Sequence, residues 1–330
     1  MFDFLPQTPL DAGELQTIKK QIATQVSSLI KRRPPPAVLH HYTDAWGLKG
    51  IIESGRIRAT HIAYMNDASE YLHAVYLLSE HIRAAKKTVT DKDQLALLDQ
   101  IDEPVAGTKP EHVAPYLVAC FSEKENSLNQ WRAYARGEGG YSIGFDCHSL
   151  SAALTQQDAI LAPALYDRNE QSILTRALLD WSLNEYPKLA SKRPPAERQT
   201  HLKSWAHHLL WFSSGLAPIM KNPAFEEESE WRSIYLLRAK REAQFIAKPR
   251  GLMPVVEMKL GQPNPFVPLS EELPNDTVTT FPDKLPIVSL WAGPGAASEV
   301  SLLAGRTLLE KYGYSGVALS SSKIPFRVSL

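Results

Sequence analysis

The segment His40-His41-Tyr42-Thr43 ends a short apolar stretch and precedes a helix that Asp44 can cap. An imidazole nitrogen at the end of a strand can hold a substrate hydroxyl, and the backbone groups after it can bond a flat amide. A histidine that bonds only its own loop would look the same in sequence. The segment therefore predicts a ligand-binding strand end, with a purely structural histidine as the alternative.

A second group of candidates follows the most apolar stretch of the chain. Residues 115–122, PYLVACFS, predict a buried strand that ends at Ser122, and Trp131, Arg132 and Tyr134 follow shortly after. Arginine can bind a phosphate through two hydrogen bonds, and tryptophan or tyrosine can stack on a base. These residues predict a pocket for an aromatic ligand that carries phosphate. Core aromatic residues with an arginine ion pair are the alternative.

Four carboxylates lie within five positions, at Glu226, Glu227, Glu228 and Glu230. Such a cluster is usually a solvated acidic turn. Here the sequence continues into a predicted strand, in which alternate residues face the same way, so Glu228 and Glu230 would share a face. A carboxylate held against an apolar wall can act as a general base or stabilise a developing positive charge.

Two loop patterns have structural explanations. Asn66 or Asp67 can cap the helix that follows, with Glu70 three or four residues later as in a capping box. Residues 293–295, Gly-Pro-Gly, stand between a strand and a helix and could cradle an anion. Ser298, however, takes the place of the third glycine of a dinucleotide-binding loop. A tight turn with Ser298 as the helix N-cap explains this loop better.

Metal and disulfide chemistry are not indicated. His201 and His208 can share one helix face, but no carboxylate lies beside them in the sequence. Two cysteines, Cys120 and Cys147, are too few for a disulfide scaffold or a cysteine zinc site. We therefore expect two buried thiols and no metal.

The composition excludes several classes of protein. The 330 residues carry 36 Lys and Arg against 36 Asp and Glu, so no overall charge favours the coating of nucleic acid. The apolar share of 44% is enough for a sizeable core. No apolar run approaches the roughly 18 residues of a membrane span, and the N-terminus lacks a signal-peptide pattern. A cytoplasmic, bacterial-type protein is the prediction.

The elements that must position these residues mix strands and helices. We expect residues 1–36 to form an N-terminal helix, over 11–33, and a proline spacer. Residues 37–330 would form a single α+β domain with a helical insert at about 165–222. The N-terminal helix would pack on this body or pair two copies in a homodimer. Strands are expected near 37–43, 56–65, 115–122, 141–145, 229–239, 254–260, 286–292 and 315–324, and helices near 45–54, 66–87, 91–101, 127–135, 170–186, 199–221 and 298–311.

Several of these segments resemble the bacterial domain-of-unknown-function family 2971 (DUF2971). Matching stretches in the family's order are LHHYTDAWGLKGIIESGRIRATHIAYMNDASEY, LVACFSEKENSLNQWRAYARGEGGYSIGFD, NPAFEEESEWRSIY, and AGPGAASE with SSKIPFR. Together they cover nearly the whole chain from about residue 37 to 327. The family name carries no activity, so this resemblance alone predicts no function.

The region after the prolines also resembles ADP-ribosyltransferase-like folds, including RNA 2′-phosphotransferases and DNA-modifying relatives. The likeness rests on a strand ending in His-Tyr-Thr, a helix ending in Ser-Gly, and the strand after it. It implies a split sheet with helices packed around it. By position, His41 would bind the nicotinamide-side ribose of NAD, and Glu230 would stabilise the ribosyl cation. Ser122 would line the nicotinamide pocket, with Tyr141 as a rival for that role.

This second resemblance implies an NAD-dependent ADP-ribosyltransferase-like enzyme with NAD as co-substrate, acting on a protein or nucleic acid as a bacterial toxin or phage-defence effector. Glu230 and His41 would be catalytic. The NAD-binding set would be His41, Tyr42, Thr43, Tyr64, Ser122, Trp131, Arg132 and Tyr141.

Two alternatives remain. One is a non-catalytic nucleotide- or protein-binding module of the same fold. The other is an RNA 2′-phosphotransferase-like enzyme, which would need a wall of basic side chains. Candidates for that wall are Arg132, Arg136, Arg232, Arg238, Lys240 and Arg241.

Overall fold

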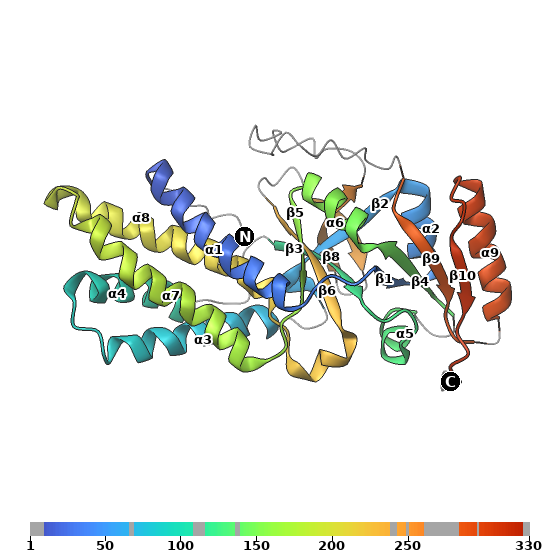
Figure 1. Ribbon diagram of the computed structural model, residues 1–330, viewed down its shortest axis with the longest axis horizontal. Coiled ribbons are helices and arrows are strands. Elements are labelled where there is room, and N and C mark those ends of the chain that lie inside the picture. The colour runs from blue at the N-terminus through green and yellow to red at the C-terminus, as the bar shows by residue number, and fades with distance from the viewer. Residues whose placement is uncertain are drawn as a thin grey trace. The chain divides into compact units, whose positions relative to one another are not determined.

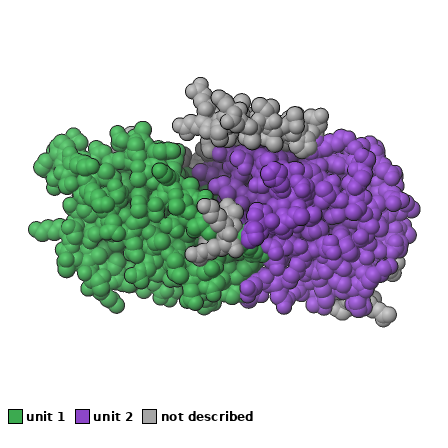
Figure 2. Space-filling view, in the orientation of Figure 1, with its two compact units in different colours: residues 1–33, 61–116, 164–223 green, residues 34–60, 117–163, 224–330 purple. Residues whose placement is uncertain are grey.

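The structure is a computed structural model that describes residues 10–65, 69–107, 116–135, 139–237, 243–248, 251–260, 284–295 and 297–325. It confirms the α+β class, because helices and a mostly antiparallel sheet both occur in it. The chain divides into two compact units, each assembled from distant segments (Figure 2). Unit 1 comprises residues 1–33, 61–116 and 164–223, and unit 2 comprises residues 34–60, 117–163 and 224–330. The domain limits expected from the sequence stay a prediction.

Unit 1 is built from helices that pack on one another (Figure 1). Helix α3 contacts α4 and α7, while α8 contacts α1, α4 and α7. Side-chain caps begin two of these helices: Asp91 and Asp167 accept backbone N–H bonds at 2.9 Å and 2.8 Å. The described elements are α1 (Ala12–Arg32), η1 (Ile62–Tyr64), α3 (Ser69–Lys86), α4 (Lys92–Ala106), α7 (Arg168–Ala190), α8 (Pro195–Ser213) and η3 (Ser214–Ile219).

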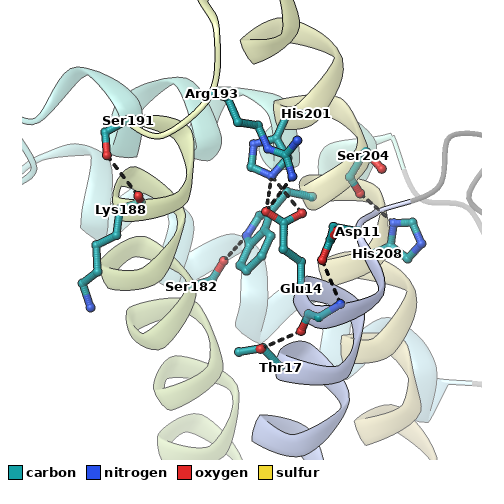
Figure 3. Close-up of polar contacts among 12 residues, drawn as sticks. Asp11, Glu14, Thr17, Ser182, Lys188, Ser191, Arg193, His201, Ser204 and His208 are labelled. Atoms are coloured by element: carbon teal, nitrogen blue, oxygen red, sulfur yellow. Dashed lines mark hydrogen bonds and ion pairs between the residues drawn. The ribbon is translucent and has the colours of Figure 1, made fainter.

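A buried polar cluster fixes α1 to α8. Glu14 is 9% exposed, and one of its carboxylate oxygens accepts hydrogen bonds from Arg193, at 2.9 Å, and from His201 Nε2, at 3.1 Å (Figure 3). The ring of His201 stacks on Tyr186 with centroids 5.6 Å apart. The fold therefore places beside His201 a carboxylate that the surrounding sequence does not contain. In the described part of the chain, no group of three or more His, Cys, Asp or Glu residues is placed to hold a metal ion.

Unit 2 is built on a ten-stranded sheet. Its strands follow the order β10-β9-β4-β1-β3-β2-β8-β7, and β6 pairs with both β3 and β5. The described registers are antiparallel except that of β9 and β10, which run parallel. The strands are β1 (Val38–Thr43), β2 (Arg56–His61), β3 (Tyr116–Ser122), β4 (Tyr141–Asp146), β5 (Ala159–Pro163), β6 (Glu230–Leu236), β7 (Gln244–Lys248), β8 (Gly251–Lys259), β9 (Ile287–Ala292) and β10 (Ala318–Ser321). The helical elements are α2 (Ala45–Ser54), α5 (Leu128–Tyr134), α6 (Cys147–Gln156), η4 (Pro223–Glu228) and α9 (Ser298–Lys311).

The alternation of side chains separates two faces of this sheet. Directly opposed residues of antiparallel strands point to the same face, and successive residues along a strand point to opposite faces. We call one the α5 face; from the registers it carries His40, Tyr42, Cys120, Ser122, Ser142 and Gly144. We call the other the α9 face; it carries Leu39, His41, Thr43, Phe121, Tyr141, Ile143 and Phe145.

Contacts with helices agree with this assignment. Tyr42 packs edge-on against Trp131 of α5, with ring centroids 4.7 Å apart. On the other face, the Tyr141 hydroxyl donates to the Ser301 carbonyl of α9 at 2.9 Å. Any side chain at Gly305 of α9 would meet Leu290 at 2.7 Å, so the glycine lets α9 lie close to β9.

Several predicted elements are confirmed. Asp44 caps α2 by accepting the Gly47 N–H at 2.7 Å, and Gly55 ends it in the left-handed region at φ 64°. The predicted start of α3 at Asn66 or Asp67 lies outside the described residues. The helix expected over 199–221 is wrong beyond Ser213, where a 3-10 turn follows.

Other predictions differ from the structure in instructive ways. The strand expected over 56–65 ends at His61, and a short 3-10 turn follows it. Ser298 is not an N-cap: it is the first residue of α9, and its hydroxyl donates to the carbonyls of Gly293, at 2.9 Å, and Gly295, at 2.6 Å. The hydroxyl thus closes the preceding turn instead of accepting from the helix. Elements that the sequence did not predict are β5, α6 and β7.

Candidate functional site

The three strands that carry the predicted motifs are neighbours in the sheet of unit 2. His40 of β1 lies opposite Ser122 of β3, and β6 also pairs with β3. The Glu123 N–H donates to the Ser229 carbonyl at 3.0 Å, which joins the end of β3 to the start of β6. Residues from three distant parts of the sequence are therefore brought within two strand spacings of each other, about 10 Å.

Tyr42 and Trp131 form the aromatic centre of the α5 face. Both are buried, at 5% and 1% exposure. The Tyr42 hydroxyl donates to the Lys124 carbonyl at 2.6 Å and accepts from the Ser127 N–H at 3.0 Å. The Trp131 indole N–H donates to Asn126 Oδ1 at 2.9 Å. These bonds hold the loop between β3 and α5 against the sheet, and they already use the polar atoms of both rings.

Ser122 joins β3 to the acidic segment. Its hydroxyl donates to the Glu228 carbonyl at 2.7 Å and accepts from the Lys124 N–H at 3.1 Å. The same segment is held by Asn129, whose amide donates to Glu227 Oε2 at 2.6 Å. Ser229 then adopts a left-handed conformation at φ 45°, an uncommon one for a residue with a side chain, before β6 begins.

Glu230 is a buried carboxylate at the start of β6. It is 3% exposed, and its Oε2 lies 3.1 Å from a guanidinium nitrogen of Arg232, which is 1% exposed. Burial raises the pKa of Tyr134, and the neighbouring charges of Cys120, Glu230 and Glu228 raise it further. Tyr134 belongs to α5, so the charge of Glu230 acts near that helix. The bond between the Glu123 N–H and the Ser229 carbonyl sets Glu230 beside Ser122, and we therefore assign Glu230 to the α5 face.

The two adjacent histidines point to different faces. His40, on the α5 face, is 4% exposed; its Nδ1 lies 3.3 Å from the Ser142 hydroxyl, and burial lowers its pKa to about 4. His41 lies on the α9 face, where its Nδ1–H donates to the Cys120 carbonyl at 2.8 Å. Burial lowers the pKa of His41, and this hydrogen bond opposes the shift in part. His40, and not His41, therefore shares a face with Ser122.

The remaining predicted residues are dispersed. Thr43 and Tyr141 lie on the α9 face, with the Tyr141 hydroxyl bonded to α9. Arg132 is an exposed side chain of α5. Tyr64 belongs to unit 1, where its half-exposed ring packs edge-on against His61. The structure thus gathers Tyr42, Ser122, Trp131 and Glu230 on the α5 face and places His41, Thr43 and Tyr141 on the opposite face.

The predicted wall of basic side chains needs one correction. Arg232 is buried and paired with Glu230, because its position in β6 points it at the α5 face and away from solvent. Of the other candidates, Arg132 is exposed, and Arg136, Arg238, Lys240 and Arg241 lie outside the described residues. The predicted burial of both cysteines is correct for Cys147, whereas Cys120 is half-buried.

Sequence reasoning did not name Ser142, chose His41 instead of His40 as the histidine of the site, and assigned Arg232 to a basic wall instead of to a pair with Glu230. The predicted pairing of Glu228 with Glu230 on one strand face is wrong, because Glu228 ends η4 and the left-handed Ser229 precedes β6. The same alternation rule, applied within β6, puts Arg232 beside Glu230. A buried charge in a strand normally has a partner of opposite charge, so this spacing was a usable signal. The choice between His40 and His41 had no such signal, because it depends on how β1 pairs with β3.

Comparisons with known proteins identify part of the chain. Residues 130–233 match the family model described as "Protein of unknown function (DUF2971)". This segment is similar to the DUF2971 family, and we call it the DUF2971 region. The predicted DUF2971 resemblance is thereby confirmed over residues 130–233, and the DUF2971 region begins within α5 and ends within β6, so it includes Trp131, Glu230 and Arg232. No curated protein and no solved structure matches the chain. In the described segments, every helix is too short or too polar to cross a membrane.

Proposed function

We propose that unit 2 is an ADP-ribosyltransferase-like domain that cleaves the nicotinamide–ribose bond of NAD, with Glu230 as the residue that stabilises positive charge on the ribose. The observation that carries the proposal is the placement of Glu230: a carboxylate 3% exposed, on the α5 face with Ser122 and Tyr42, and near Tyr134 of α5. Carboxylates so buried occur mainly where a charge is paired or used.

The chemistry needs such a group. When the bond between C1′ and the pyridinium nitrogen breaks, nicotinamide leaves with the bonding electrons and positive charge develops on the ribose. A fixed carboxylate in a site with little water stabilises that charge far more than water does. An acceptor oxygen or nitrogen then bonds C1′ and loses its proton. Arg232, 3.1 Å from Glu230, would hold the carboxylate in one orientation before substrate binds.

The residues around Glu230 fit NAD in part. The half-buried Tyr134 offers a ring for stacking, and the exposed guanidinium of Arg132, on the same helix, suits a phosphate. His40 would replace His41 as the imidazole nearest the ribose. A macromolecular acceptor, and a role as toxin or phage-defence effector, belong to the same proposal.

A specific observation favours a second candidate, a non-catalytic binding module of the same fold. The hydroxyls of Tyr42 and Ser122 each make two hydrogen bonds to the protein, and Glu230 is already paired with Arg232. A face whose polar groups are satisfied internally is well suited to a rigid scaffold. This candidate predicts saturable nucleotide binding without release of nicotinamide.

The two candidates are separated by incubating purified protein with NAD and a cell lysate and measuring free nicotinamide by chromatography. Glu230→Gln keeps the shape of the side chain but removes its charge. Glu226→Gln is the matched control, because it makes the same change at an exposed position of the same acidic segment. We expect release by the wild type and Glu226→Gln, and none by Glu230→Gln with an intact thermal transition. Binding of NAD by calorimetry without release would support the binding module instead.

A further inference from the structure

A cavity lies within the helical unit. It has a volume of about 440 Å³ and is lined by residues of α3, α4, α7, α8 and η3, all within unit 1. This volume falls in the lower part of the range of small-molecule sites, roughly 300–1,000 Å³. Well-packed interiors contain few voids larger than a water molecule, so a cavity of this size needs an explanation.

The wall of the cavity is mainly apolar. Each helix contributes residues spaced three or four apart, which is the stripe that an amphipathic helix turns inward. Examples are Ala74 and Leu78 of α3, Ile101 and Val105 of α4, and Leu178 of α7. Water gains few hydrogen bonds in such a space, so an apolar ligand group would be favoured there.

One lysine lies among the described residues that line the cavity. Lys203 and His207 line it, and because they are four residues apart on α8 they lie on the same helix face. The described residues of the wall include no Asp or Glu. Across the described segments Lys203 makes no ion pair, and its side chain is exposed. A ligand with an anionic head beside Lys203 and an apolar tail among the leucines would match this distribution.

We infer that unit 1 binds a medium-chain acyl carboxylate, with the carboxylate at Lys203 and the alkyl chain in the cavity. The positive charge of Lys203 favours an anionic head group, and the apolar wall and the volume of the cavity favour an alkyl tail of medium length. The site is separate from the proposed NAD chemistry and does not depend on it. Lys203 lies within the DUF2971 region, as Glu230 does.

The test is calorimetric titration of the full chain with decanoate, below its micelle concentration, and with decanol as the uncharged analogue. We expect one saturable site for decanoate and weaker binding of octanoate, by about tenfold or more, since two fewer methylenes are buried. Lys203→Met keeps the apolar stem and removes the charge, and we expect it to weaken decanoate binding by roughly five- to tenfold without changing decanol binding. Lys192→Met, an exposed lysine outside the cavity wall, is the matched control and should bind as the wild type does.

Ala74→Phe provides a second line of evidence, because a larger side chain on the wall should fill the cavity. It should abolish binding while thermal unfolding stays cooperative. If this variant fails to fold, the chain-length series and Lys203→Met still decide the matter. Absence of decanoate binding by the wild type would overturn the inference. Equal binding of decanoate and decanol, unaffected by Lys203→Met, would overturn the assigned anionic head.

Discussion

The buried imidazole of His40 should make the stability of unit 2 depend on pH in a defined window. Burial lowers the pKa of His40 from its ordinary value of 6.5 to about 4. In the unfolded chain the ring takes up a proton near pH 6.5, whereas in the folded chain it does so only near pH 4. Between these values the unfolded state binds more protons, so the free energy of unfolding falls as the pH is lowered.

The size of the effect follows from the same two values. The gap between 6.5 and about 4 corresponds to about 3 kcal/mol of stability, present above pH 6.5 and lost by about pH 4. Below pH 4 the ring is protonated in both states and contributes no further slope. His61 of unit 1, also buried with a pKa lowered to about 4, should add a parallel effect in its own unit.

The assay is urea unfolding of wild type and His40→Asn at several pH values from 4 to 7. The substitution removes the titrating ring but keeps a polar group near Ser142. We expect the pH slope of the unfolding free energy to decrease by up to about 1.4 kcal/mol per pH unit in the variant. His148→Asn makes the same substitution at an exposed position of α6 and is the matched control. Equal slopes for wild type and His40→Asn would refute the argument that a neutral, buried imidazole lies on the α5 face.

Two further predictions concern single contacts. Glu14→Gln weakens the hydrogen bonds of this side chain to Arg193 and His201, and we expect it to lower the free energy of unfolding by about 1–3 kcal/mol. Proteolysis within α1 should also become faster. An unchanged rate of cleavage in α1 would contradict the role of Glu14 in holding α1 to α8. Gly140→Ala places a methyl group 2.5 Å from the Cβ of Ala135 at a φ of +84°, so it should cost at least about 1 kcal/mol more than Gly55→Ala, whose φ is +64° but whose surroundings are open. Equal melting temperatures for these two variants would show that the close approach at Gly140 relaxes freely.

Local sequence signals predicted much of the fold. Asp44 and Gly55 gave both ends of α2, because a cap and a left-handed glycine act through the few residues beside them. The apolar run of 115–122 gave β3 for a similar reason. Strand β5 carries no such signal: it is five residues long, and it exists because it pairs with β6, from Ala159 opposite Tyr235 to Pro163 opposite Trp231.

The candidate site also depends on contacts between distant segments, which local sequence signals do not predict. The nearness of Glu230 to Ser122 depends on the pairing of β6 with β3, which no local pattern encodes. His40 and His41 are consecutive in a strand, so their rings point to opposite faces. Which of them shares a face with Ser122 depends on the pairing of β1 with β3. The Glu14–His201 contact joins residues 187 positions apart, so neither residue's surroundings could reveal it.

The most direct test of the central claim is the rate of nicotinamide release at saturating NAD, compared between wild type and Glu230→Gln. If Glu230 stabilises the charge that develops on the ribose, the wild type releases nicotinamide and the variant does so at least about 100-fold more slowly. The affinity for NAD should change much less. Equal rates in the two proteins, or no release by a wild type that folds normally, would contradict the assignment of Glu230.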